Sequence, residues 1–282
     1  MVSVRSAAVT RPGEDVGLAA ARREDDLALG LALADVADSI TLRRFQAEDL
    51  RVETKPDLTP VTEADRAVEQ ALRDRLAAAR PADAVVGEEF GSTAEDSRRR
   101  WIIDPIDGTK GYVRGMPVWA TLLALEEEGE IAVSVVSAPA LQRRWWASRG
   151  DGAFVHDAVA EGPHRLHVSS VKVLEDAQIS HGGLGEWMKI GRLQPLLELI
   201  ARCWRSRAFG DVWSYMLVAE GAVDIGGVEP DVRLWDLAAA LLIVEEAGGR
   251  FTDLHGVRRA DGGSAVATNG LLHDATLAIV GW

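Results

Sequence analysis

Apolar residues recur every three to four positions in two stretches of the first 80 residues, and this spacing predicts two helices that each bury one face. The first helix is expected to begin at Leu27, within the pattern LALGLALADVADSI. The second is expected to run from Thr62 to about Ala79. Between them, the segment 54–60 contains two prolines and predicts a turn.

Short apolar runs predict strands in the next part of the chain. They lie at residues 84–87, 101–104, 117–125, 130–137 and 143–148. After Gly162-Pro163 strands and helices alternate, with strands expected at 177–181 and 222–226 and helices at 192–202, 211–220 and 236–247. The pattern predicts a mixed α/β (α+β) protein.

The change of pattern near residue 160 divides the chain into three parts. Residues 1–26, rich in Arg, Ala and acidic residues, are expected to form a frayed N-terminal extension without assigned chemistry. Residues 27–160 are expected to form an α+β half, and residues 161–282 an α/β half.

Charge and cysteine content narrow the possible partners. The 282 residues include 31 Lys and Arg against 44 Asp and Glu, a net charge of −13. Such a chain lacks the positive surface that attracts nucleic acid or an anionic membrane, so neither partner is expected. The single Cys203 excludes an internal disulfide, and no apolar run approaches the roughly 20 residues that span a bilayer. These features predict a cytoplasmic protein.

The most informative segment follows the apolar run at 101–103. Asp104 directly follows this apolar run, and Asp107 lies three residues later, where a tight turn can direct both carboxylates into one pocket. The peptide carbonyl of Ile106 offers a further oxygen ligand, and the N–H groups of Gly108 and Thr109 suit a phosphate oxygen. A turn rich in aspartate, followed by a helix cap, would also explain this segment taken alone.

Acidic residues at three other places in the sequence are candidates for the same pocket. Glu88 and Glu89 follow a predicted strand, and because neighbours on a strand point to opposite faces, Glu88 is the one chosen for the pocket. Asp65 lies three residues after Thr62, and Asp236 opens an apolar helix. Each has an ordinary alternative, which is a solvated loop for the glutamates and a helix cap for Asp65 and Asp236.

Taken together, the motifs resemble the inositol monophosphatase superfamily from about residue 27 to the C-terminus. The signature D-P-I-D-G-T is intact, and T-x-x-D, G-E-E and W-D-x-A-A-x…E-A-G-G appear in the family's order. The resemblance implies a layered αβαβα sandwich, with residues 27–160 as the metal-binding half and 161–282 as the substrate-selecting half. It also implies Mg²⁺-dependent hydrolysis of a small phosphate ester, and we expect a homodimer.

The resemblance further implies roles for individual residues. Two or three Mg²⁺ ions per subunit would be held by Asp65, Glu88, Asp104, Asp107, Asp236 and the carbonyl of Ile106. Asp65 and Thr109 would orient and deprotonate the attacking water. The phosphate would be bound by Asp107, Gly108 and Thr109.

Elementary electrostatics agrees with a cation site. Close carboxylates repel by roughly 4 kcal/mol per pair at an effective dielectric constant near 20, and hard divalent cations remove that repulsion. The chain has neither a P-loop, nor a cysteine-based phosphatase loop, nor a zinc-type histidine cluster. Metal-assisted hydrolysis is therefore favoured, and a non-catalytic metal- or phosphate-binding protein is the alternative of another class.

Substrate choice is expected to depend on the second half. The resemblance places Glu229, seven residues before Asp236, at the position that contacts the leaving group, and Gly210-Asp211 stands where inositol phosphatases tend to have Gly-[ST]-Ala-Ala. Acids at these two positions suit a leaving group that carries a cation or N–H groups, and Arg207 is the third candidate. Asp211 as a helix N-cap and Arg207 as a surface residue are the alternatives. The stretches 55–69, 137–154 and 262–274 resemble actinobacterial histidinol-phosphate phosphatases. Phosphatases of inositol 1-phosphate or 3′-phosphoadenosine 5′-phosphate would share the metal ligands and remain alternatives.

Overall fold

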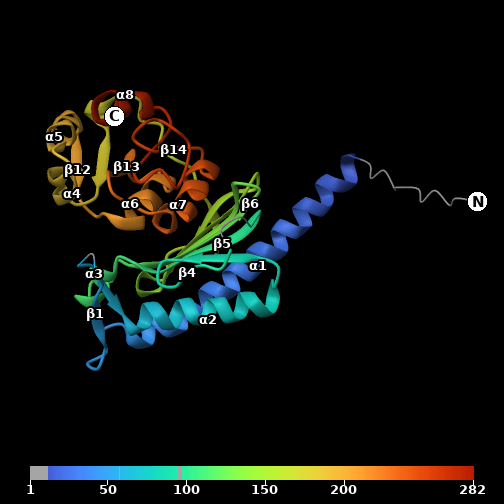
Figure 1. Cartoon of the computed structure of the whole chain (residues 1–282). Helices are drawn as coiled ribbons and strands as arrows, with labels where there is room; N and C mark the ends of the chain where they lie inside the picture. The colour runs from blue at the N-terminus through green and yellow to red at the C-terminus, as the bar shows by residue number, and fades with distance from the viewer. Residues whose placement is uncertain (1–11, 57, 95–96) are drawn as a thin grey trace, which may run out of the picture.

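The first helix is longer than its apolar pattern predicts. The computed structural model describes residues 12–56, 58–94 and 97–282, so residues 1–11 of the expected extension lie outside the described residues. Helix α1 runs from Pro12 to Arg44, and its first turns project beyond the rest of the molecule in Figure 1. The expectation that the chain is frayed up to residue 26 is therefore wrong from Pro12 onward. Buried Asp26 explains part of the difference, since it pairs with Arg99 at 2.6 Å.

A short hairpin and a second helix follow. Strands β1 (Val52–Thr54) and β2 (Pro60–Thr62) pair antiparallel, and α2 (Glu63–Ala79) begins directly afterwards. Helix α2 coincides with its prediction because Thr62 caps it as the sequence indicates.

The larger sheet has eight strands in the order β10-β9-β8-β7-β6-β5-β3-β4. They are β3 (Ala84–Gly87), β4 (Gly91–Ser92), β5 (Arg99–Asp107), β6 (Ala120–Glu127), β7 (Glu130–Ala138), β8 (Arg143–Ser148), β9 (Gly152–His156) and β10 (His164–Arg165). Only the β3–β5 pair is parallel among these described strands. A five-residue helix, α3 (Thr109–Val113), follows β5.

The smaller sheet has the order β12-β11-β13-β15-β14. Its strands are β11 (Gln178–His181), β12 (Arg205–Arg207), β13 (Ile225–Glu229), β14 (Arg250–Thr252) and β15 (Ala265–Thr268). The helices of this half are α4 (Leu184–Lys189), α5 (Leu193–Arg202), α6 (Asp211–Ala219), α7 (Leu234–Glu246) and α8 (His273–Val280). Single 3₁₀ turns lie at Pro139–Leu141 and Leu174–Asp176.

Packing arranges these elements in five layers, which confirms the predicted mixed α/β fold. Trp101 and Ile103 of β5 pack with α1 and α2, whereas Ile102 faces α6 and α7 on the other side of the same sheet. Helices α6 and α7 lie between the two sheets, and α4, α5 and α8 cover the outer face of the smaller one (Figure 1). Alternation along β5 therefore produces two separate cores from one strand.

Two predicted strands begin three residues later than expected. The run predicted at 117–125 forms β6 from Ala120, and the run predicted at 222–226 forms β13 from Ile225. In the second case the backbone N–H groups of Ala222 and Val223 still bond to the Leu217 carbonyl in the turn that ends α6. The short elements β4, β10, β12, α3 and α4 have no periodic signal long enough to predict. Among the described residues, no helix combines the length and the apolar character needed to cross a bilayer.

Candidate active site

Asp104 and Asp107 are brought together by an irregularity at the end of β5. On a regular strand, residues three apart point to opposite faces. The pairing of β5 with β6 shifts between Asp104 and Asp107, and Pro105 lies within the shift, where it has no N–H to offer. The carbonyl of Pro105 instead accepts a hydrogen bond from Thr121 Oγ1 at 2.7 Å. The shift lets both carboxylates face the same side.

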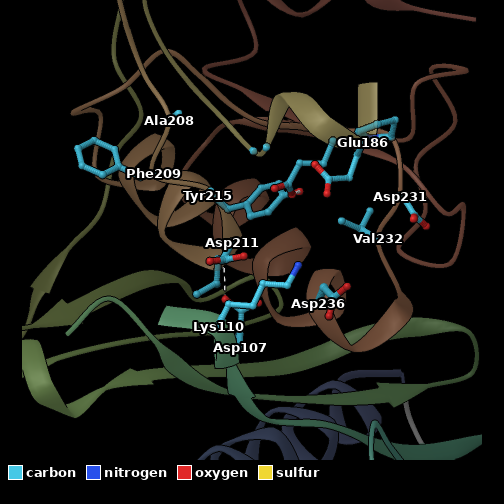
Figure 2. A pocket seen from close by; sticks show the side chains of 16 residues that line it. Asp107, Lys110, Glu186, Ala208, Phe209, Asp211, Tyr215, Asp231, Val232 and Asp236 are labelled. Atoms are coloured by element: carbon cyan, nitrogen blue, oxygen red, sulfur yellow. Dashed lines mark hydrogen bonds between the residues drawn. The ribbon is translucent and has the colours of Figure 1, made fainter. Parts of the chain in front are cut away.

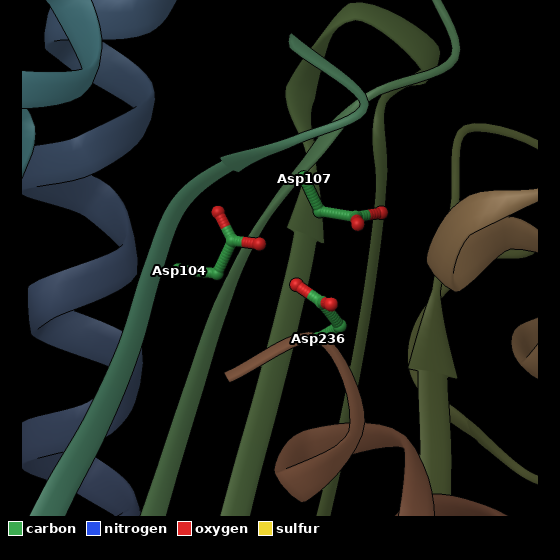
Figure 3. Close-up of side chains that lie close together, drawn as sticks. All are labelled: Asp104, Asp107 and Asp236. Atoms are coloured by element: carbon green, nitrogen blue, oxygen red, sulfur yellow. The ribbon is translucent and has the colours of Figure 1, made fainter. Parts of the chain in front are cut away.

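Asp236 completes a cluster with these two residues. One carboxylate oxygen from each of Asp104, Asp107 and Asp236 lies within 4.8 Å of the other two. Figure 3 shows the three side chains close together. Asp236 comes from the first turn of α7, where its Oδ2 accepts the backbone N–H of Arg233 at 2.7 Å. The same residue is therefore both a helix cap and a member of the cluster. The cluster joins the larger sheet to a helix of the second half.

Burial and mutual repulsion dominate the electrostatics of the cluster. Burial, followed by the charges of Glu88, Asp107 and Asp236, raises the pKa of Asp104 well above its usual value. Burial likewise raises the pKa of Asp107, and it raises that of Asp236 to about 7. Asp104 Oδ1 is buried and has no hydrogen-bond partner among the described residues. This orphaned acceptor, with acids on three sides, fits an oxygen-ligated divalent cation.

Asp65 lies beside Thr109 and also caps α2. Its Oδ2 accepts the backbone N–H of Thr62 at 2.7 Å and the Thr62 hydroxyl at 2.6 Å. Its Oδ1 lies 3.4 Å from Thr109 Oγ1, which donates to the Ile106 carbonyl at 2.9 Å. Burial raises the pKa of Asp65 to about 6. The capping interpretation and the catalytic one apply to different oxygens of one carboxylate.

Glu88 lies at the edge of the cluster and is paired with a lysine. Lys55, between β1 and β2, reaches Glu88 Oε1 at 2.7 Å and Glu89 Oε1 at 2.6 Å. The Glu89 side chain is only 5% exposed against 23% for Glu88, so Glu88 is the more accessible of the two. The sequence did not single out Lys55. The signal that could have indicated Lys55 is its place in a turn that contains two prolines.

The phosphate-binding candidates lie where β5 passes into α3. Gly108 adopts a left-handed conformation (φ 83°), and an added Cβ would stand 3.2 Å from the Val118 carbonyl oxygen and 3.4 Å from Asp211 Oδ2. A side chain at this position would therefore be strained by both backbone and space. Asp107 Oδ2 accepts the N–H of Val212 at 2.8 Å, which ties this turn to α6.

A cavity of about 470 Å³ opens beside the cluster. Its wall is strongly acidic, with Asp107, Glu186, Asp211, Glu229, Asp231 and Asp236 among the residues that line it. Among the sixteen described lining residues, Lys110 is the only cationic one, and Figure 2 shows its ammonium group pointing into the cavity. Neither Glu186 nor Lys110 was a sequence candidate, since a single charge in a short helix or after a motif has no distinguishing pattern.

Two of the three substrate-binding candidates line this cavity. Gly210, not Asp211, is the N-cap of α6, and Asp211 itself has a left-handed backbone (φ 51°). Glu229 ends β13 and accepts a hydrogen bond from the Tyr215 hydroxyl at 2.6 Å. Burial raises the pKa of Glu229 to about 8. Arg207 lies on β12, exposed and bonded to the Ser206 carbonyl, and is not among the described lining residues.

Comparison with known proteins adds independent information. The model of the inositol monophosphatase family matches residues 23–280. A Mycobacterium tuberculosis protein named Histidinol-phosphatase is 59% identical over 253 residues, which cover 90% of this chain and 96% of that protein. A Streptomyces coelicolor protein of the same name is 54% identical over 257 residues, with the same coverage. The solved structure of an IMPase from Thermotoga maritima has a TM-score of 0.80 at 32% identity and covers 91% of this chain and 96% of that one.

Proposed function

The chain belongs to the inositol monophosphatase family, and we propose that it is a Mg²⁺-dependent phosphatase that hydrolyses histidinol phosphate to histidinol and phosphate. The observation that carries this proposal is the position of the Asp104–Asp107–Asp236 cluster at a cavity whose wall also holds Asp211 and Glu229. The cluster suits the phosphate end of the substrate, and the further acids suit a cationic leaving group. The two relatives named Histidinol-phosphatase support the choice of substrate.

The donor set of the site fits two or three Mg²⁺ ions. We assign one ion to Glu88, Asp104 and the Ile106 carbonyl, a second to Asp104, Asp107 and Asp236, and a third to Asp65 and Glu88. When bound, the ions neutralise the acids, polarise the phosphate and lower the pKa of water. Lys55 pairs with Oε1 of Glu88, which leaves Oε2 of this glutamate for an ion.

Thr109 and Asp65 are assigned to the attacking water. Rotation of the Thr109 hydroxyl from the Ile106 carbonyl toward Asp65 Oδ1 leaves Oγ1 free to accept a hydrogen bond from water. As the water gives its proton to Thr109 Oγ1, the hydroxyl proton of Thr109 passes to Asp65 Oδ1, which acts as the general base. Gly108 and Thr109 direct their N–H groups to the phosphate, and Asp107 shares its binding.

Asp211 and Glu229 are assigned to the leaving group, which carries an ammonium and an imidazole. A hydrogen bond between charged groups contributes about 1.5–3 kcal/mol, so one such contact is enough to separate this ester from a neutral polyol phosphate. Arg207 stays a prediction, as do the homodimer and the cytoplasmic location.

A substrate comparison tests the proposal directly. Phosphate release is measured from histidinol phosphate, inositol 1-phosphate and 3′-phosphoadenosine 5′-phosphate, with Mg²⁺ and with excess chelator. We expect the highest kcat/KM for histidinol phosphate and no release in chelator. Asp104→Asn should lower activity by about a thousandfold or more, whereas the exposed control Asp151→Asn should not.

Each negative result would reject a different part of the proposed function. Full activity in excess chelator would contradict the metal mechanism. A preference for inositol 1-phosphate would contradict the substrate and leave the metal mechanism standing. A chain that binds Mg²⁺ but releases no phosphate from any ester would be a binding protein.

A further inference from the structure

Glu186 is an acid of the cavity that the roles above do not use. It lies in the first turn of α4, is half-buried, and lines the cavity across from Lys110 (Figure 2). Within the described residues its carboxylate has neither an ion pair nor a hydrogen bond. A half-buried carboxylate without a partner is costly to desolvate further, so it favours whatever cation can approach it.

Two adjacent glycines place Glu186 next to Glu229. An added Cβ at Gly183 would stand 2.5 Å from Glu186 Oε2, and one at Gly182 would stand 2.5 Å from Glu229 Oε1. The two carboxylates therefore rest against neighbouring residues of the loop between β11 and α4. The charge of Glu186 is also among those that raise the pKa of Glu229 and of Asp211. Three acids thus share one side of the cavity.

Four of the other five acids of this wall have a hydrogen-bond or ion-pair partner. Tyr215 donates to Glu229, the N–H groups of Val212 and Arg233 donate to Asp107 and Asp236, and the Arg233 guanidinium pairs with Asp231 at 3.7 Å. Among the described residues of the wall, Glu186 and Asp211 are the carboxylates without such a partner, and the charge of Lys110 acts on Asp211. Glu186 also lies outside the Asp104–Asp107–Asp236 cluster, so cations bound there would not use it.

We propose that Glu186 is a specificity-determining residue, which binds the positively charged end of the leaving group and so selects cationic phosphate esters over neutral ones. This inference rests on the proposed function, whose leaving group carries an ammonium and an imidazole. A polyol leaving group would leave Glu186 hydrated and gain nothing from it. Because Glu186 does not touch the reacting phosphate, its contribution is made to binding and falls on KM rather than on kcat.

Steady-state kinetics on two esters test this role. The values of kcat and KM are measured for histidinol phosphate and for glycerol 2-phosphate with the wild type, Glu186→Gln, Glu186→Asp and the exposed control Glu175→Gln. We expect Glu186→Gln to lower the kcat/KM ratio of the two esters about tenfold, through KM, as for the loss of a charged hydrogen bond. Glu186→Asp should recover part of the ratio, and Glu175→Gln should leave it unchanged.

Ionic strength provides a second readout. Salt screens a charge interaction, so the KM of the wild type for histidinol phosphate should rise with salt more steeply than that of Glu186→Gln. An equal salt dependence in the two proteins would contradict a charge contact at Glu186.

The outcomes separate this inference from the proposed function. If the wild type prefers histidinol phosphate and Glu186→Gln keeps that preference, the role of Glu186 is overturned and the function stands. Equal losses on both esters would assign Glu186 to the fold and also overturn it. If the wild type does not hydrolyse histidinol phosphate, the proposed function fails, and the same variants are compared on ethanolamine phosphate. An unchanged ratio there overturns the role of Glu186 as well.

Discussion

Two acids of the site are each held in place by the helix that they cap. Asp65 uses one oxygen for the start of α2 and presents the other to Thr109. Asp236 accepts the N–H of Arg233 at the start of α7 and still reaches the cluster. A cap bond restricts the rotamer of the carboxylate, so both acids are oriented before a substrate arrives. Capping is therefore compatible with the roles that we propose for these two acids.

The Thr109 hydroxyl is expected to affect turnover and not metal affinity. Thr109→Ala removes the hydroxyl that we propose orients the water, and kcat should fall by roughly 10² to 10⁴ while metal affinity changes little. Thr109→Ser, which keeps the hydroxyl, is the matched control and should retain most of the rate. Kinetics at saturating Mg²⁺ and calorimetric metal binding check both parts. Lost metal binding with unchanged turnover at saturation would assign Thr109 to structure.

His273 shows how a residue far from the cluster sets acid sensitivity. The ring is fully buried at the start of α8. Thr252 donates its hydroxyl to the Asp253 carbonyl, so it accepts from His273 Nε2–H at 2.9 Å. Thr268 accepts the N–H of Gly270 and can donate to Nδ1 at 3.1 Å. The network suits a neutral ring, and burial lowers the pKa of His273 to about 4.

A pH dependence of stability follows from His273. Because its pKa is lower in the folded protein than the unfolded value near 6.5, the unfolded state binds more protons between these values. The contribution of the neutral His273 ring to the free energy of unfolding is complete above about pH 6.5 and is lost as the pH falls toward 4. This residue should therefore make the free energy of unfolding about 2 kcal/mol lower at pH 5 than at pH 7.

Urea unfolding of wild type and His273→Gln at several pH values checks this expectation. The acids of the site titrate in both proteins, so their effect cancels in the difference. A difference that does not change between pH 7 and pH 5 would contradict the role of His273.

At the scale of elements, α2 holds the turn that carries Glu88. Glu69 is fully buried one helical turn after Asp65, and its carboxylate accepts the N–H groups of Glu89 at 2.7 Å and Phe90 at 3.1 Å. Arg73 pairs with the same carboxylate at 2.8 Å and also donates to the Gly91 carbonyl. One helix therefore places Asp65 through its cap and Glu88 through this buried ion pair.

Removal of Glu69 should be costly. Glu69→Ala leaves the Arg73 guanidinium and two N–H groups without their partner, so we expect a loss of about 3–5 kcal/mol in the free energy of unfolding. The exposed acid Asp74 on the same helix is the matched control, and Asp74→Ala should cost less than about 0.5 kcal/mol. Urea unfolding measures both. A loss below about 1 kcal/mol for Glu69→Ala would show that the turn is held by other contacts.

For the whole molecule, the cluster is a junction between two layers. Asp104 and Asp107 belong to the larger sheet, whereas Asp236 belongs to α7, which lies between the sheets. A cation bound to all three would link two parts of the chain that the sequence separates by more than 100 residues. Such a ligand binds the folded state and not the unfolded one.

Metal should therefore stabilise the fold. At a free Mg²⁺ concentration 100 times the Kd, the free energy of unfolding should rise by about 2.7 kcal/mol, which thermal unfolding with and without Mg²⁺ measures as a higher Tm. Asp236→Asn should remove most of this shift, and the surface control Asp151→Asn should keep it. A full shift in Asp236→Asn would mean that the stabilising ion binds elsewhere.

Local elements were predictable where the apolar pattern is clear. Helix α2 coincides with its pattern because burial of one face forces that spacing, and strands β3 and β8 coincide with short apolar runs, of which β3 is buried on both faces. The start of α1 and the short strand β12 were not predictable, because they depend on partners distant in the sequence. Asp26, for example, pairs with Arg80 and Arg99.

The sequence by itself determined which acids form the cluster of Asp104, Asp107 and Asp236, since D-P-I-D-G-T and W-D-x-A-A contain them. Only the tertiary structure decided how they meet. The shift between β5 and β6 turns Asp104 and Asp107 to one side, against the alternation of a regular strand. Folding of distant elements likewise brought Lys55 to Glu88 and Glu186 to the cavity, and left Arg207 outside its wall. A local pattern reports which face of an element is buried, but the neighbours of a lone charge depend on how the layers pack.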